Sequence, residues 1–236
     1  MATVIPMTNI RIAMSAEKGF LKLLQATDSL FPIGAYTLSC GMETYTDLGI
    51  VRDTESLSEF LDSYIYLLPY NDAGFAAKAA MGEDLIMLDE LCAASRSPYE
   101  LRNGSNKMCI RFLKAENSLG NYKLLDEYGK AISDGKCFGC FPVAMGLFIR
   151  EIDIDLKTGL EMYMYSLLSS MVNHAVKLVP LRQLEGQKCL AEASEKIPAA
   201  ADKAANVKLC ELGTGGGGFD LRSMQHEKLY SRIYIS

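Results

Sequence analysis

The sequence predicts an all-α protein, a single-domain helical bundle of about ten helices with a flexible C-terminal arm. Apolar residues recur with a period of about 3.6 along nearly the whole chain, which is typical of amphipathic helices. Strand-like alternation occurs only near residues 4–12 and in the C-terminal tail. With 236 residues, 49% of them hydrophobic, the chain is long enough to bury a full core.

The individual helices follow from the apolar spacing and from residues that start or stop helices. Ser15 is expected to cap a first helix that ends before the turn at Pro32 and Gly34. Further helices are expected at residues 37–48, 54–68, 71–81, 83–94, from 98 to about 113 with an interruption near Asn103-Gly104, and at 122–132, 139–149, 156–178, 181–193 and 198–207. The helix at 156–178 has a wide apolar stripe, so we expect it to be the central helix of the core.

The last residues divide the chain into two parts. Residues 1–212 are expected to form an all-helical domain with a short N-terminal lead, and 213–236 a glycine-tethered arm. From Leu229 onward apolar residues alternate with Tyr230, Arg232 and Tyr234, as on an extended chain. Such an arm can close its own core as a strap or bind a partner. Tyrosine and arginine are enriched at interface hot spots, which favours the partner-binding arm.

Composition and charge exclude several classes of function. The net charge is −5 and Lys and Arg do not cluster, which argues against nucleic acid or an anionic membrane as the main partner. The longest uncharged stretches, 137–149 and 162–176, fall short of the roughly 20 residues that a membrane-spanning helix needs. No secretory signal is evident at the N-terminus, so a cytoplasmic protein is expected.

The residues that could carry chemistry do not form a recognisable catalytic centre. With only two histidines, no nucleophile–base arrangement can be nominated, and neither an enzyme activity nor a cofactor is expected. Gly213–Gly218 matches a dinucleotide-binding pattern but has no room for the fold that pattern requires. Cys137 and Cys140 have a spacing that suits soft metals or thiol exchange, yet no further ligands accompany them, so packing is the favoured role. His174 is expected to be a core histidine.

Four stretches of sequence, taken together, point to a family. They are Asp28–Glu43 (DSLFPIGAYTLSCGME), Phe141–Gly146 (FPVAMG), Leu167–Ser170 followed by Val176–Gln183 and Gly186-Gln187, and Ser223–Ser236. In this order and spacing the sequence resembles the urease accessory protein UreF family. Two positions depart from the pattern: Cys140 stands where the family commonly has His, and Arg182 where Gly is usual.

The resemblance implies an all-helical, non-enzymatic protein that dimerises and joins UreD (also called UreH) and the GTPase UreG on apo-urease during nickel insertion. It also implies that the protein modulates UreG. Eight residues fall on the family's complex-forming tail: Arg222, Ser223, His226, Glu227, Tyr230, Ser231, Arg232 and Tyr234. No metal site is expected, with Cys137 and Cys140 as weak candidates. Two alternatives stay open: a small metal-handling or thiol-active protein centred on these cysteines, and an all-α protein that binds a nonpolar ligand between Met- and Leu-rich helices.

Overall fold

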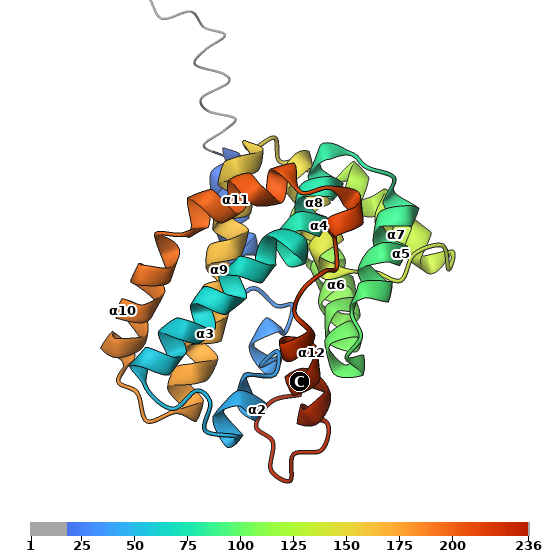
Figure 1. Cartoon of the computed structure of the whole chain (residues 1–236). Coiled ribbons are helices and arrows are strands. Elements are labelled where there is room, and N and C mark those ends of the chain that lie inside the picture. The colour runs from blue at the N-terminus through green and yellow to red at the C-terminus, as the bar shows by residue number, and fades with distance from the viewer. Residues whose placement is uncertain (1–17, 236) are drawn as a thin grey trace, which may run out of the picture.

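A computed structural model describes residues 18–235, which form an all-α fold without strands in that range (Figure 1). Residues 18–26 are helical, and eleven α-helices and three short 3-10 helices follow. The α-helices are α2 (Met42–Asp47), α3 (Thr54–Leu67), α4 (Asp72–Met81), α5 (Leu85–Ser95), α6 (Tyr99–Leu119), α7 (Lys123–Ser133), α8 (Phe141–Glu151), α9 (Leu156–Leu178), α10 (Gln183–Ser194), α11 (Ile197–Asn206) and α12 (Gly217–His226). The 3-10 helices are η1 (Ala35–Thr37), η2 (Leu68–Tyr70) and η3 (Leu209–Glu211). The predicted fold class is confirmed.

Helix α8 lies at the centre of the core. Every residue from Phe141 to Ile149 is buried. This segment is apolar on all sides, as is typical of a helix that is surrounded by other helices. A Cβ on Gly146 would lie 2.1 Å from the Ala76 carbonyl oxygen, so glycine lets α8 press directly against the alanine-rich α4. Helix α9, at the predicted residues 156–178, packs against α2, α3, α4, α8, α10 and α11, so the central position is shared between α8 and α9.

The apolar stripe of α9 is confirmed. Leu160, Met164, Leu168, Val172 and Ala175 are all buried, and the helix packs against α10 and α11. In Figure 1, α3, α9 and α10 lie on one side of the molecule and α5, α6 and α7 on the other. His174 is buried on α9 as predicted, but its Nδ1 has no hydrogen-bond partner among residues 18–235.

Two helix predictions were wrong. Helix α6 runs through Asn103-Gly104 without interruption. A Cβ at Gly104 would lie only 2.9 Å from Leu38 Cδ1, so glycine at this position permits close packing and does not break the helix. The helix predicted at 37–48 is instead η1 followed by α2. Cys40 and Gly41 have positive φ angles of 51° and 82°, which interrupt a right-handed helix. The Ser15 cap and the alternation at 4–12 lie outside the described residues.

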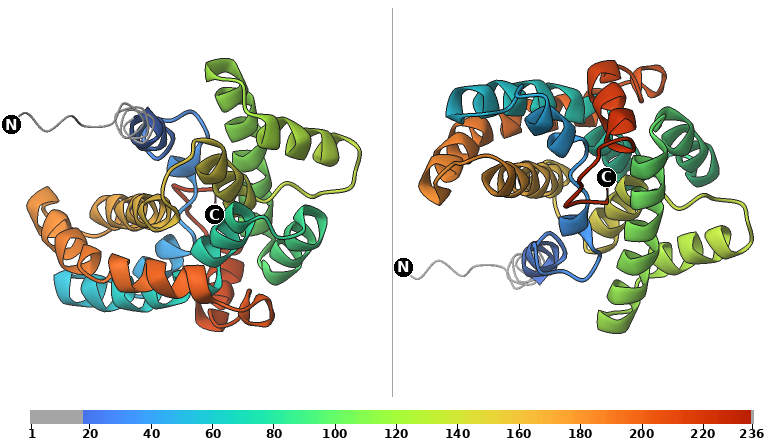
Figure 2. Two further views of the ribbon diagram at one scale, coloured as in Figure 1. Left: turned by 90° about the horizontal axis from the view of Figure 1, so that it is seen from above. Right: turned by 90° about the horizontal axis from the view of Figure 1, so that it is seen from below.

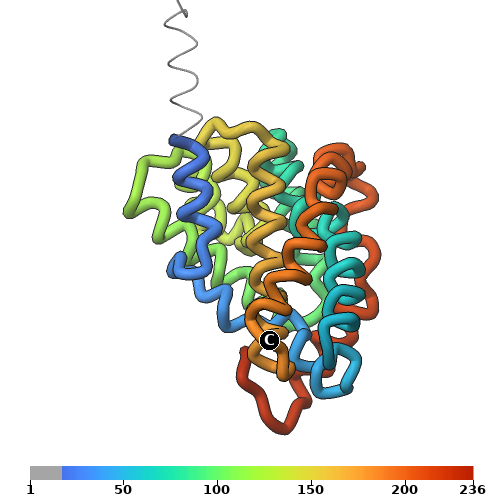
Figure 3. Tube along the Cα trace, turned by 90° about the vertical axis from the view of Figure 1, so that its left-hand side faces the viewer, coloured from blue at the N-terminus to red at the C-terminus, as the bar shows by residue number. Residues whose placement is uncertain are grey.

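The alternation from Leu229 predicted an extended segment, but residues 229–235 form no strand and loop out at one end of the molecule before returning (Figure 3). Before them, residues 217–226 form α12, a helix that the sequence did not predict. Seen from below, the C-terminal end lies near the middle of the molecule (Figure 2). The backbone N–H of Ile235 donates to the Thr37 carbonyl at 2.8 Å. The structure thus does not confirm a flexible arm.

Candidate partner-binding site

Helix α12 is held on the body through an aromatic cluster. The ring of Phe219 lies 5.3 Å from that of Phe60, 5.6 Å from Tyr45 and 5.9 Å from Tyr64, measured between centroids. Ser223 and His226, four and seven positions further along the same helical face, are both buried. The glycine-rich segment before the helix gives it an N-cap in the left-handed region, with φ 82° at Gly216.

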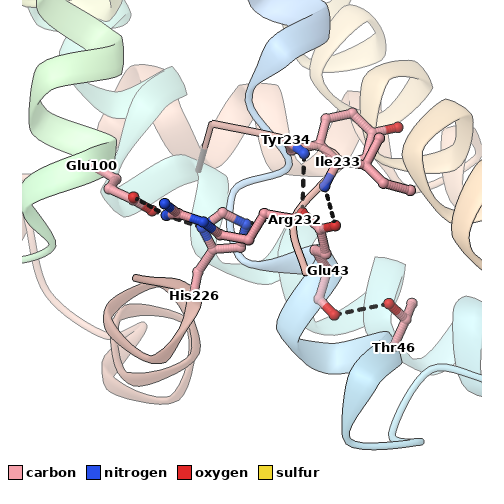
Figure 4. Close-up of polar contacts among 7 residues, drawn as sticks. All are labelled: Glu43, Thr46, Glu100, His226, Arg232, Ile233 and Tyr234. Carbon is pink, nitrogen blue, oxygen red and sulfur yellow. Dashed lines mark hydrogen bonds and ion pairs between the residues drawn. The ribbon is translucent and has the colours of Figure 1, made fainter. Parts of the chain in front are cut away.

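The ring of His226 lies between two carboxylates. Its Nε2 is 3.0 Å from Glu43 Oε2, and its Nδ1 is 2.7 Å from Glu100 Oε2 (Figure 4). The side chain is fully buried, at 0% exposure. Each ring nitrogen is within hydrogen-bond distance of a carboxylate oxygen, and the tautomer of the ring sets which nitrogen donates. Through these two contacts His226 joins α12 to α2 and α6 at once.

Glu43 also accepts hydrogen bonds from the backbone of the segment that follows α12. The backbone N–H of Ile233 donates to Oε1 at 2.6 Å and that of Tyr234 to Oε2 at 3.1 Å (Figure 4). Burial raises the pKa of Glu43, but the hydrogen bonds from His226, Ile233 and Tyr234 outweigh it and leave the pKa below its ordinary value. A single ionised side chain on α2 therefore fixes both the end of α12 and the returning tail.

Tyr234 completes the inner face of the tail. Its ring packs edge to face against His174 with centroids 4.7 Å apart, and it is buried. Burial and the nearby charge of Lys177 lower the pKa of His174 to about 4, so this histidine is neutral near pH 7. The tail thereby covers a neutral, apolar part of α9.

The outer face of the tail is formed by different residues. Tyr230 is fully exposed, and Ile233 keeps 72% of its surface in contact with solvent. Arg232 is exposed, yet its guanidinium bonds to Glu100 Oε1 at 2.8 Å, which fixes its direction (Figure 4). An apolar and cationic surface is thus presented outward by a segment whose backbone is anchored underneath.

The structure separates the eight predicted tail residues into two groups. Ser223, His226 and Tyr234 are buried against the body, whereas Glu227, Tyr230, Ser231 and Arg232 are exposed. Arg222 is half-buried, with its guanidinium 6.0 Å from the centroid of the Tyr45 ring. Sequence reasoning missed Glu43 and Glu100, the partners of His226. Glu43 lies within the quoted stretch 28–43, but nothing local in that stretch indicates that it pairs with His226.

The cysteine pair, for which the sequence favoured a packing role, is buried among the helices. Both thiols are buried, and Cys140 is the N-cap of α8, where its backbone N–H donates to Asp89 Oδ1 at 3.0 Å. Burial raises the pKa of Cys137 to about 11, while a hydrogen bond with Cys92 and burial raise that of Cys140. A cysteine that undergoes thiol exchange reacts as the thiolate, so these raised pKa values disfavour thiol exchange. Among the described residues no group of three or more His, Cys, Asp or Glu is placed to hold a metal.

The fold and the site define an all-helical protein that closes its C-terminal segment over its own body while presenting that segment's outer face. The family model of UreF matches residues 51–194. The urease accessory protein UreF of Actinobacillus pleuropneumoniae serotype 5b is 35% identical over 221 residues, with 91% of this chain and 97% of the relative covered. That of Lachnoclostridium phytofermentans is 31% identical, covering 92% and 98%.

The chain belongs to the urease accessory protein UreF family. Membership makes it an accessory protein rather than an enzyme, in agreement with the sequence prediction. The matched range 51–194 covers α3 to α10 and does not include α2 or α12, which carry the Glu43–His226 contact. None of the helices in the described part of the chain is both long and apolar enough to cross a membrane.

Proposed function

We propose that this chain assembles with UreD/UreH and the GTPase UreG on apo-urease, serves nickel insertion during urease maturation and modulates UreG. We propose further that it acts in the cytoplasm as a homodimer. Membership of the UreF family supports the role in urease maturation in general terms. The finer statements rest on the resemblance of its sequence motifs to that family.

We propose that the partner contacts the outer face of the tail, namely Tyr230, Ser231, Arg232 and Glu227. The observation that carries this proposal is the complete exposure of Tyr230 on a segment anchored by Glu43. An exposed aromatic ring on an already ordered backbone can be buried by a partner at little cost in conformational entropy. Arg222, Ser223, His226 and Tyr234 then act by holding the segment in place rather than by touching the partner.

Co-elution of purified variants with UreD/UreH and UreG tests this assignment. Tyr230→Ala should weaken the complex by about tenfold or more, since burial of a tyrosine at a hot spot contributes roughly 2 kcal/mol. Tyr66→Ala on α3 is the matched control, because Tyr66 is 65% exposed and lies outside the tail. Unchanged binding by Tyr230→Ala, with the parent melting temperature retained, would contradict the assignment of the outer face.

A further inference from the structure

A cavity of about 150 Å³ lies between α12 and the body. Large apolar side chains from five helices of the body line its walls, among them Tyr64, Phe75, Met108, Phe141 and Leu167. The C-terminal segment lines it as well, through Gly213, Gly215, Gly216, Phe219 and Ser223. The cavity is therefore mostly apolar and partly open, and the docked α12 forms one of its walls.

Two polar atoms at this cavity have no partner. Arg96 Nε and Ser223 Oγ are buried and make no hydrogen bond within residues 18–235, although both residues line the cavity. Ser223 is only 1% exposed. Buried donors in folded proteins are paired in the great majority of cases, because an unpaired one costs its full desolvation free energy. An occupant that offers a hydrogen-bond acceptor would satisfy these atoms.

The charges around the cavity select a neutral occupant. Arg96 already pairs with Asp72 at 2.8 Å, so its positive charge is balanced. Asp220 on α12 also lines the cavity, which adds a second carboxyl group and would repel an anion. A hydroxyl group suits this arrangement, because its oxygen can accept from Arg96 Nε while its proton is donated to a carboxylate.

We propose that this cavity is a binding site for a small neutral molecule with an apolar body about the size of one ring and a single hydroxyl group. Its volume is comparable to that of engineered apolar cavities that bind benzene. Since α12 forms one wall of the site, the occupant stabilises the docked C-terminal segment as well as filling the cavity.

Phenol and toluene form a matched pair of probes, since toluene replaces the hydroxyl by a methyl group of similar size. Titration calorimetry on the full-length chain should show saturable binding of phenol, about tenfold tighter than that of toluene. The variant Ser223→Ala should bind phenol more weakly than the parent and should bind toluene with unchanged affinity. A crystal soaked in phenol should show the ring under α12, with its oxygen next to Arg96 Nε.

Cavity-filling variants localise the binding. Leu167→Phe should abolish phenol binding, and Met108→Phe serves the same purpose if the first variant does not fold. Leu24→Phe is the control, because Leu24 lines a separate groove on the outer surface beside Leu119. The proposal is overturned if phenol does not bind up to about 10 mM, if the soaked cavity holds only water, or if toluene binds as tightly as phenol.

Discussion

Ser223 Oγ lies 2.8 Å from the position that a Cβ on Gly41 would occupy, so α12 docks directly against the backbone at the start of α2. Gly41 also has a φ of 82°, which disfavours any other residue. Gly41→Ala should therefore lower the free energy of unfolding by about 2–3 kcal/mol and loosen α12.

Gly49→Ala provides the matched control for this substitution. Gly49 has a φ of 66°, but a Cβ there would meet no described atom within 4 Å. Urea unfolding of both variants separates backbone strain, which they share, from the contact with Ser223. Equal losses of stability would show that the Gly41–Ser223 contact is unimportant.

Replacing Glu43 by glutamine should release the tail. The glutamine amide has a single acceptor oxygen, so it cannot accept from His226 and from both backbone N–H groups as the carboxylate does, and at least one of these buried contacts is lost. We expect a loss of about 2 kcal/mol and faster hydrogen exchange at the amides of Ile233 and Tyr234. Glu59→Gln on the exposed face of α3 should change neither quantity. Protected amides in Glu43→Gln would mean that another contact holds the tail.

Acid should undock the tail for the same reason. The pKa of Glu43 is lowered in the docked state, because the hydrogen bonds from His226, Ile233 and Tyr234 outweigh its burial. Docking is thus fully favoured above the ordinary value of about 4.3 and is lost as the pH falls through the lower, docked-state value. Limited proteolysis between about pH 6 and pH 3 should show the tail becoming accessible before the body unfolds. In Glu43→Gln this acid transition should be absent.

Glu116 gives a pH effect of the opposite sign. It is buried on α6, and burial raises its pKa to about 7 despite the nearby charge of Lys22. The folded chain then holds a proton that the unfolded chain releases, so stability falls as the pH rises from about 4.5 to 7. Glu116→Gln should remove this fall and be about 1–2 kcal/mol more stable than the parent at pH 8. Urea unfolding at pH 5 and pH 8 measures the difference.

The exposed Tyr230 and the buried Tyr234 should contribute differently to the stability of the protein. Tyr234→Ala should lower the free energy of unfolding by about 2–3 kcal/mol, because it removes a buried ring from His174. Tyr230→Ala should leave stability within about 0.5 kcal/mol of the parent, since that side chain is fully exposed. Thermal melts of the isolated variants check both expectations. A comparable loss in both variants would mean that Tyr230 also contributes to closing the core.

Most of the helical body could be predicted from the sequence. The apolar period placed α3, α4, α5, α7, α9, α10 and α11 within a few residues of their observed bounds, because amphipathic helices that bury one face carry that face in their sequence. The buried stripe on α9 follows from the same local signal. Four stretches spread from Asp28 to Ser236 were, in their order and spacing, sufficient to indicate the family.

Only the tertiary structure decided how the tail is used. Alternation at residues 229–236 predicted one face carrying both Tyr230 and Tyr234, yet the first is exposed and the second buried. The difference arises because Glu43, about 190 positions away, binds the backbone of the tail, and Gly41 leaves room for Ser223. Local periodicity reports which side chains favour burial, but it contains no information on which distant carboxylate or glycine will meet them. The pairing of His226 with Glu43 and Glu100 therefore had to come from the fold.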